Sequence, residues 1–230
     1  MLLSALRGGF DPLTIIVTLF SLCFVVFCTM PIHEYAHALI ATKLGDPTPR
    51  LAGRLTINPM AHISPLGALM ILLCGFGYAK PVSVNPRNFK DPKKGMAFTA
   101  IAGPIANLIM CFVFILVKTI ISQVFSRIGV HSASSTIILS AILTFLDFAA
   151  VINANLAVFN LLPIPPLDGS RILQLLIPSK YYYTVMQYER YIVIVVFVLI
   201  ITGLLSTPLS YLSRYVLKFF TFIAQLPFSF

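Results

Sequence analysis

The sequence predicts an all-α polytopic membrane protein, a bundle of about four to six transmembrane helices with a re-entrant segment and short β-strands on its cytoplasmic side. The 230 residues are 58% hydrophobic and only 10% charged, whereas a soluble domain is about 45–50% apolar and about 25% charged. Long apolar runs alternate with segments rich in Pro and Gly. This length suits a single membrane-embedded domain over 1–230, with a core at 13–178 and C-terminal helices at 188–227.

The first long helical segment is predicted at residues 13–43. At about 1.5 Å per residue it exceeds the roughly 30 Å thickness of the hydrocarbon layer, so it must tilt or protrude. Pro31 lies inside this segment, and a proline removes one backbone hydrogen bond from a helix. We therefore expect Pro31 to kink the helix, with a new helix starting at Pro31 as the alternative.

Residues 44–94 have a different character. Gly and Pro exclude a long helix in 44–63, and the alternation of polar and apolar residues predicts short strands at Arg54–Ile57 and Val82–Val84. Between them, residues 64–79 are apolar but short and contain several glycines. This favours a re-entrant segment over a complete membrane crossing.

The second half of the chain repeats the membrane pattern. Spanning helices are predicted at 96–125, 136–162 and 188–206. The middle one ends at the proline-rich stretch 163–170, after which a short helix is expected. We expect the tail from Pro208 to lie in the membrane interface as an amphipathic helix, with a further crossing as the alternative.

The formal net charge of +9 fits basic loops facing an anionic membrane surface. No basic stretch is interleaved with stacking aromatic residues, so no nucleic-acid partner is expected. If 64–79 is re-entrant, the loops 43–63, 80–94 and 163–190 share one side and hold eleven of the sixteen Lys and Arg residues. This places them in the cytoplasm and predicts a multi-pass protein of a cell membrane, the bacterial plasma membrane, with its active site near the cytoplasmic face.

The pattern His33-Glu34-x-x-His37 falls inside the first predicted helix. Positions four apart share a helix face, so both imidazoles can reach one ion, and Glu34 can take a proton from metal-bound water. Ionisable groups at membrane depth cost roughly 2.5–3.5 kcal/mol each on insertion scales and usually have a function. A metal site is therefore favoured over a polar cluster without metal.

Asp168 is the candidate for a third ligand, because catalytic zinc sites have three protein ligands and one open position. It follows the proline-rich break, and such a break at membrane depth must be buried in protein or line a cavity. Gly169 lets the backbone pass close to its neighbour. The alternative is that Asp168 caps the short helix that follows, and one residue can have both roles.

These motifs carry a family resemblance. His-Glu-Tyr-Ala-His at 33–37 and Asn-Leu-Leu-Pro-Ile-Pro-Pro-Leu-Asp-Gly at 160–169 together resemble the site-2 protease family of intramembrane zinc metalloproteases. The segment Gly103–Asn107 is similar to that family, and residues 54–67 resemble its small subgroup without a PDZ domain.

The resemblance implies one Zn²⁺ per chain, held by His33, His37 and Asp168, with Glu34 activating water. It also implies hydrolysis of peptide bonds in or near transmembrane segments of membrane-protein substrates, as in regulated intramembrane proteolysis. Such a substrate has to unwind before hydrolysis, because a transmembrane helix satisfies its own hydrogen bonds. The two predicted strands are candidates to hold the unwound segment by strand addition.

Three polar residues are candidates for contacts with substrate. Asn153 and Asn160 are seven apart and share a helix face, so both are oxyanion candidates, whereas Asn155 points elsewhere. The alternative for each Asn is a hydrogen bond between helices. His62 is a candidate substrate-binding or proton-transfer group, and the alternative is a solvated loop histidine.

Two other functions use the same ligands. A zinc transporter needs a path through the membrane, and no second intramembrane ligand cluster is visible beyond Asp147. We expect Asp147 to be a buried hydrogen-bonded partner or a protonated acid rather than a second metal ligand. A non-catalytic scaffold of the same fold has no need for Glu34, which is intact here.

Overall fold

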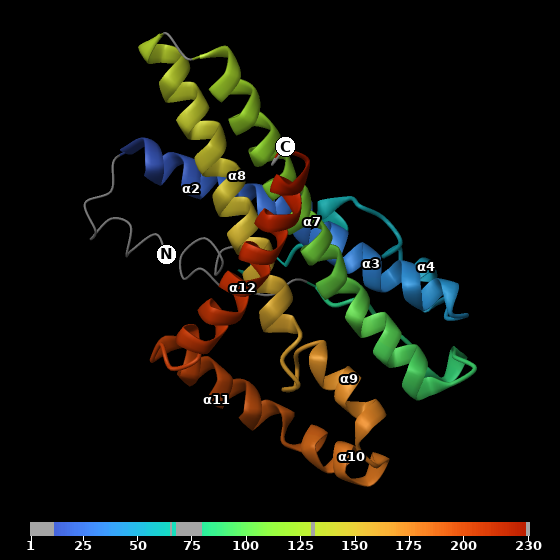
Figure 1. Cartoon of the computed structure of the whole chain (residues 1–230). Helices are drawn as coiled ribbons and strands as arrows, with labels where there is room; N and C mark the ends of the chain where they lie inside the picture. Colours follow the sequence, from blue (N-terminus) through green and yellow to red (C-terminus); the bar gives the residue numbers. More distant parts are fainter. Residues whose placement is uncertain (1–11, 65, 68–79, 130–131, 229–230) are drawn as a thin grey trace.

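The computed structural model describes residues 12–64, 66–67, 80–129 and 132–228, which are helical or irregular (Figure 1). Among these residues, three helical stretches are long and apolar enough to cross a membrane: Pro12–Lys43, α7 (Pro92–Ile128) and α8 (Ala133–Asn160). The shorter elements are α4 (Thr48–Leu51), α5 (Pro59–His62), η2 (Pro86–Asn88), α9 (Gly169–Leu176), α10 (Ser179–Gln187), α11 (Glu189–Ile201), α12 (Ser206–Gln225) and η3 (Leu226–Phe228).

The first spanning stretch consists of α2 (Pro12–Phe24), the π-helical turn η1 (Val25–Thr29) and α3 (Met30–Lys43). Pro31 has no N–H to donate, and the wider π-turn directly precedes it, with the Met30 N–H bonded to the Val25 carbonyl. The helix therefore continues through Pro31, and the alternative of a break before Pro31 is wrong.

The bundle core lies where α7 and α8 pack together. Its buried residues are Cys111, Phe114, Ile115, Leu146, Ala149, Ala150, Ala154 and Ala224. The alanines on α8 let helices approach closely. On the other side of this core, α2 packs on α8 and α3 packs on α7. Phe24 sits edge-on to Phe114 and Phe145, with ring centroids 5.9 and 5.3 Å apart.

The C-terminal helix α12 packs against both α7 and α8, and Figure 1 shows it (red) running beside α8 (yellow). Its residues Val216, Leu217 and Phe220 contact the core, and Ala224 is 1% exposed. The helix predicted for the tail is confirmed as α12, and one side of it packs on the bundle. The opposite side of α12 carries the exposed aromatic residues Tyr211, Tyr215, Phe219 and Phe222.

Three other predictions have different outcomes in the structure. The short helix after residue 168 is confirmed as α9. The span predicted at 188–206 contains α11, whose 13 residues reach only about 20 Å and fall short of the hydrocarbon thickness. The re-entrant segment predicted at 64–79 lies almost entirely outside the described residues.

The two predicted strands are wrong, since Arg54–Ile57 and Val82–Val84 are irregular. A strand needs a partner, and the loop around Thr56 instead folds back on itself. The Arg54 guanidinium donates to the Ala61 carbonyl, and His62 Nε2 lies 2.7 Å from the Thr56 carbonyl oxygen. The alternation of side chains reflects a closed loop rather than an edge of a sheet.

A fully buried carboxylate joins the loops at the end of α3. Asp46 accepts hydrogen bonds from the Thr48 N–H (3.0 Å) and hydroxyl (2.6 Å), the Asn85 N–H (2.7 Å) and Asn88 Nδ2 (2.7 Å). The Lys80 N–H also donates to the His62 carbonyl at 2.7 Å. The loops after α3 and before α7 therefore meet at one end of the bundle, as the topology deduced from the basic residues requires.

Replacing Asp46 with alanine should destabilise the protein by about 3 kcal/mol, because buried donors lose their acceptor. The measurement is the thermal unfolding midpoint in detergent. Asp91→Ala is the matched control: it removes an exposed carboxylate that caps α7, which costs about 1 kcal/mol. Equal losses in the two variants would contradict a special role for Asp46.

The same residue predicts a pH dependence. Burial alone would raise the pKa of Asp46, but the bonds from Thr48, Asn88 and Asn85 outweigh it and lower that pKa. Its stabilisation is therefore fully present above the unfolded-state pKa of about 3.9 and is lost as the pH falls through the lower folded value. The Asp46→Asn variant should lack this component of acid destabilisation.

Candidate metal centre

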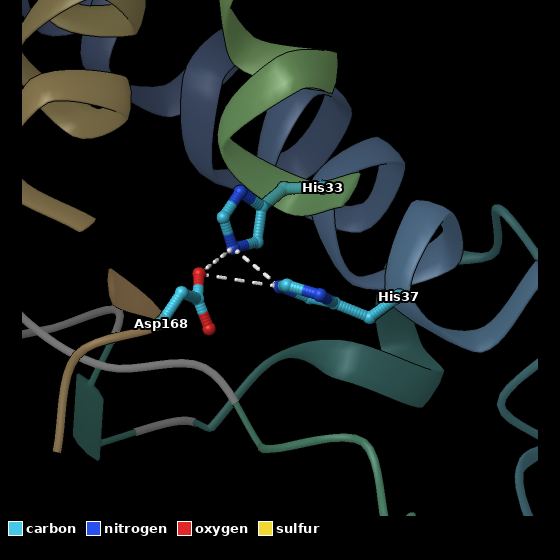
Figure 2. Close-up of side chains that lie close together, drawn as sticks. All are labelled: His33, His37 and Asp168. Carbon is cyan, nitrogen blue, oxygen red and sulfur yellow. Dashed lines mark hydrogen bonds and ion pairs between the residues drawn. The ribbon is translucent and has the colours of Figure 1, made fainter. Parts of the chain in front are cut away.

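Two imidazoles from α3 converge on one point. His33 and His37 lie four residues apart and are each 7% exposed. Their Nε2 atoms are 3.0 Å apart, and Figure 2 shows both rings directed toward the same place. The predicted shared helix face is thus observed.

Asp168 completes the group from a distant part of the chain. Its Oδ2 lies 3.4 Å from the Nε2 atoms of both His33 and His37. The backbone at Gly169 makes this approach possible, because a Cβ there would stand 2.3 Å from the carbonyl oxygens of Leu161 and Leu162. The Asp168 side chain makes no capping hydrogen bond although the residue occupies the N-cap position of α9. Its carboxylate instead lies against the Nε2 atoms of the two histidines.

The three ligand atoms fit one small cation. Tetrahedral zinc with bonds of about 2.0–2.2 Å places its ligand atoms about 3.3–3.6 Å apart, close to the observed 3.0 and 3.4 Å. Two nitrogens and a carboxylate form the donor set of known catalytic zinc sites. Among the described residues, this is the group of His, Cys, Asp and Glu side chains able to hold a metal ion.

The carboxylate is held in its ionised form. Burial alone would raise the pKa of Asp168, but hydrogen bonds and charge interactions with His33 and His37 outweigh burial and lower that pKa. An ionised carboxylate is the state that binds a metal, so the site needs no deprotonation of Asp168 at neutral pH.

Helix α7 supports the group from the opposite side. The Thr99 carbonyl accepts a hydrogen bond from His37 Nδ1 at 2.7 Å, which leaves the Nε2 lone pair of His37 directed into the centre. A Cβ on Gly103 would lie 2.3 Å from His37 Nε2 and 2.5 Å from His33 Cε1. Space for an ion therefore depends on the absence of a side chain at this position.

Sequence analysis did not single out Thr99, because a backbone carbonyl has no signature in the sequence. The Gly103–Pro104 pair was a usable signal: a glycine followed by a proline inside a spanning helix marks a place where something approaches the backbone closely. Pro104 also has no N–H for the Ala100 carbonyl, which loosens this turn of α7.

The other predicted residues lie as follows. Glu34 is 9% exposed and directly follows His33 on α3. Asn153 is fully buried, and its Nδ2 donates to the Ala149 carbonyl at 2.8 Å while its Oδ1 has no partner. Asn160 is half-buried at the end of α8, whereas Asn155 is exposed. Asn155 therefore lies on a different face of α8 from Asn153 and Asn160, as predicted.

His62 is fully buried in its own loop and bonded to the Thr56 carbonyl, so it is not a solvated histidine. It does not belong to the metal-ligand group. Asp147 pairs with Lys118 across α7 and α8 at 2.6 Å, which confirms the expected bonded partner, but its side chain is 57% exposed, so the expected burial is wrong.

Known proteins can now be compared with this geometry. The family model described as Peptidase family M50 matches residues 19–204. The chain belongs to this family. The M50 assignment confirms the resemblance to site-2 proteases, and the matched residues include Glu34 and the three candidate ligands His33, His37 and Asp168.

Named M50 relatives agree with the assignment. The chain is 40% identical over 187 residues to a putative zinc metalloprotease, YwhC, of Bacillus subtilis, covering 80% of this chain and 81% of YwhC. It is 27% identical over 143 residues to the putative zinc metalloprotease Rip2 of Mycolicibacterium smegmatis (60% and 50% covered). It is 26% identical over 159 residues to the zinc metalloprotease MJ0392 of Methanocaldococcus jannaschii (69% and 35% covered). No solved structure matches the chain significantly.

Gly103→Ala should preserve the fold of this M50 protein and weaken zinc binding about 10- to 100-fold, the range seen when the support of a metal ligand is lost. The added methyl group pushes the imidazoles out of position. Zinc content per folded protein is the measurement. Gly95→Ala is the matched control, because a Cβ there meets the Phe89 ring at 2.3 Å instead of the ligands. Equal zinc binding by both variants would show that Gly103 does not shape the site.

Proposed function

We propose that this protein is an intramembrane zinc metalloendopeptidase that hydrolyses peptide bonds in or near transmembrane segments of other membrane proteins. The observation that carries the proposal is the convergence of His33, His37 and Asp168. The two histidines and Glu34 lie on a helix able to span a membrane. Membership in the M50 family supports hydrolysis as the reaction, and the zinc in the names of its relatives supports the metal.

Each residue then has a distinct role. The two histidines and Asp168 would hold one zinc ion, which would supply Lewis acidity and lower the pKa of a bound water toward about 7. Glu34 accepts the proton of the attacking water and passes it to the leaving amine. Its burial next to His33 supports this role, because a buried carboxylate is shielded from bulk solvent and keeps the proton within the site.

Three further residues are proposed to act on the substrate. Asn153 and Asn160 on the same face of α8 would stabilise the oxyanion through their side-chain amides. In Asn153 the donor would be the second N–H of Nδ2, since the other N–H donates to the Ala149 carbonyl. His62 would act through the loop 54–63, by binding substrate backbone near the site.

The substrate is proposed to be a membrane-protein segment that unwinds at the end of the bundle where the loops meet. The irregular segment between Lys80 and Asn85 is tied at both ends, to the His62 carbonyl and to Asp46. A tied, non-helical segment can pair with an unwound chain through its backbone. The basic residues of these loops support a cytoplasmic position for the site in the plasma membrane.

Reconstitution tests the proposal. Purified protein in liposomes, loaded with zinc, should cleave a peptide with one membrane-spanning helix. Removal of zinc with a chelator should stop cleavage, and added zinc should restore it. Zinc movement across the bilayer without peptide cleavage would favour a transporter instead, although no second group of metal ligands occurs in the described parts of the chain.

A further inference from the structure

The two histidines of the metal centre differ in how their outer nitrogens are supported. His37 Nδ1 donates to the Thr99 carbonyl at 2.7 Å. His33 Nδ1 is equally buried but has no hydrogen-bond partner. A histidine that binds a metal through Nε2 carries its proton on Nδ1, and that N–H almost always needs an acceptor. The site as described therefore lacks one acceptor, next to His33.

An unused acceptor is present on α7. Asn107 is only 2% exposed, and its Oδ1 is buried with no partner. A buried amide oxygen without a donor costs about 1–3 kcal/mol. The missing acceptor at His33 and the missing donor at Asn107 are chemically complementary.

Helix geometry places Asn107 on the face of α7 that meets the histidines. Thr99, Gly103 and Asn107 are spaced four apart and share one face of α7. The Thr99 carbonyl faces His37, and a Cβ on Gly103 would lie 2.5 Å from His33 Cε1, the ring atom between Nδ1 and Nε2. The next turn on this face is Asn107.

The directions of the helices strengthen this placement. In Figure 1, α7 crosses α3 and runs in roughly the opposite direction. Moving toward the N-terminus of α3 therefore corresponds to moving toward the C-terminus of α7. Helical side chains lean toward the N-terminus of their own helix. The Asn107 side chain therefore leans toward the turn at Gly103, while the His33 ring leans toward the turn of α7 that carries Asn107.

We propose that Asn107 is a positioning residue whose Oδ1 accepts the His33 Nδ1 proton when the metal is bound, as the Thr99 carbonyl does for His37. Each zinc-binding imidazole is then fixed by one acceptor on α7. Other buried atoms without partners fit less well: Asn153 lies on α8, and the Thr99 hydroxyl belongs to the turn that faces His37. The inference rests on the proposed function in one respect, the presence of zinc.

Two variants of nearly equal shape test the assignment. Asn107→Leu removes the acceptor and Asn107→Asp keeps it. Zinc affinity, measured in detergent by competition with a chromogenic chelator, should fall about 10- to 100-fold in the leucine variant and stay within about threefold of wild type in the aspartate variant. The visible spectrum of bound Co²⁺ should change in Asn107→Leu, because the His33 ring is no longer fixed.

Ser213→Ala is the control, since Ser213 on α12 also has a buried polar atom without a partner and should bind zinc like the wild type. Wild-type zinc affinity in Asn107→Leu, or equal losses in the leucine and aspartate variants, would overturn the role of Asn107 alone. Failure of the unaltered protein to bind zinc would overturn the proposed function and this inference with it.

Discussion

Replacing Glu34 with glutamine should lower cleavage of a membrane-spanning peptide at least about 100-fold while zinc stays bound. Glutamine has nearly the same shape as glutamate but cannot accept the proton of the attacking water. Proton transfer by a positioned side chain accounts for about 10²–10⁴ in rate. The measurement combines peptide cleavage in liposomes with the zinc content of the same sample.

The chain offers a matched control for this substitution. Glu189, in the first turn of α11, is the other glutamate of the sequence. Glu189→Gln makes the same chemical change away from the metal-ligand group and should leave cleavage and zinc content unchanged. Near-normal cleavage by Glu34→Gln would remove Glu34 from the mechanism, and loss of zinc from it would mean that Glu34 helps to hold the ion.

Replacing His37 with alanine should abolish both zinc binding and cleavage. The imidazole supplies the Nε2 atom that lies 3.0 Å from that of His33 and 3.4 Å from Asp168 Oδ2. Without it, two ligands are left, and the affinity for zinc should fall by more than the roughly 10- to 100-fold associated with the loss of an outer support. Metal analysis after gel filtration measures the bound zinc.

His62→Ala separates this effect from the general loss of a buried histidine. Like His37, His62 is buried and hydrogen-bonded to a backbone carbonyl. Unlike His37, it lies outside the metal-ligand group. Its alanine variant should retain zinc. A His37→Ala protein that keeps its full zinc content would show that the ion binds elsewhere.

The ligand group could be predicted from sequence because its chemistry lies in side chains at fixed spacing. His33 and His37 share a helix face whatever surrounds the helix, and the break before Asp168 marks a backbone that must be enclosed. The groups on α7 that support these ligands could not be assigned that role from the sequence. The Thr99 carbonyl is identical to every other backbone carbonyl in the sequence, and the role of Gly103 depends on which helix crosses it.

Local patterns also misled where the chain closes on itself. The alternation at Arg54–Ile57 is typical of a strand, but hydrogen bonds to Ala61 and His62 close a loop there. Asp46 looked like one acidic residue among several, and only the structure shows that four hydrogen bonds converge on it.

The π-helical turn at Val25–Thr29 separates two tasks of one long helix. Upstream of it, α2 directs Val17, Ser21 and Leu22 inward and packs on α8, while downstream α3 carries the two imidazoles toward α7. One residue in a regular helix advances the side-chain direction by about 100°. Deleting a single residue from this turn would therefore rotate the histidines about the helix axis relative to α2. The direction in which the two imidazoles point is thus set by five residues that bind no metal.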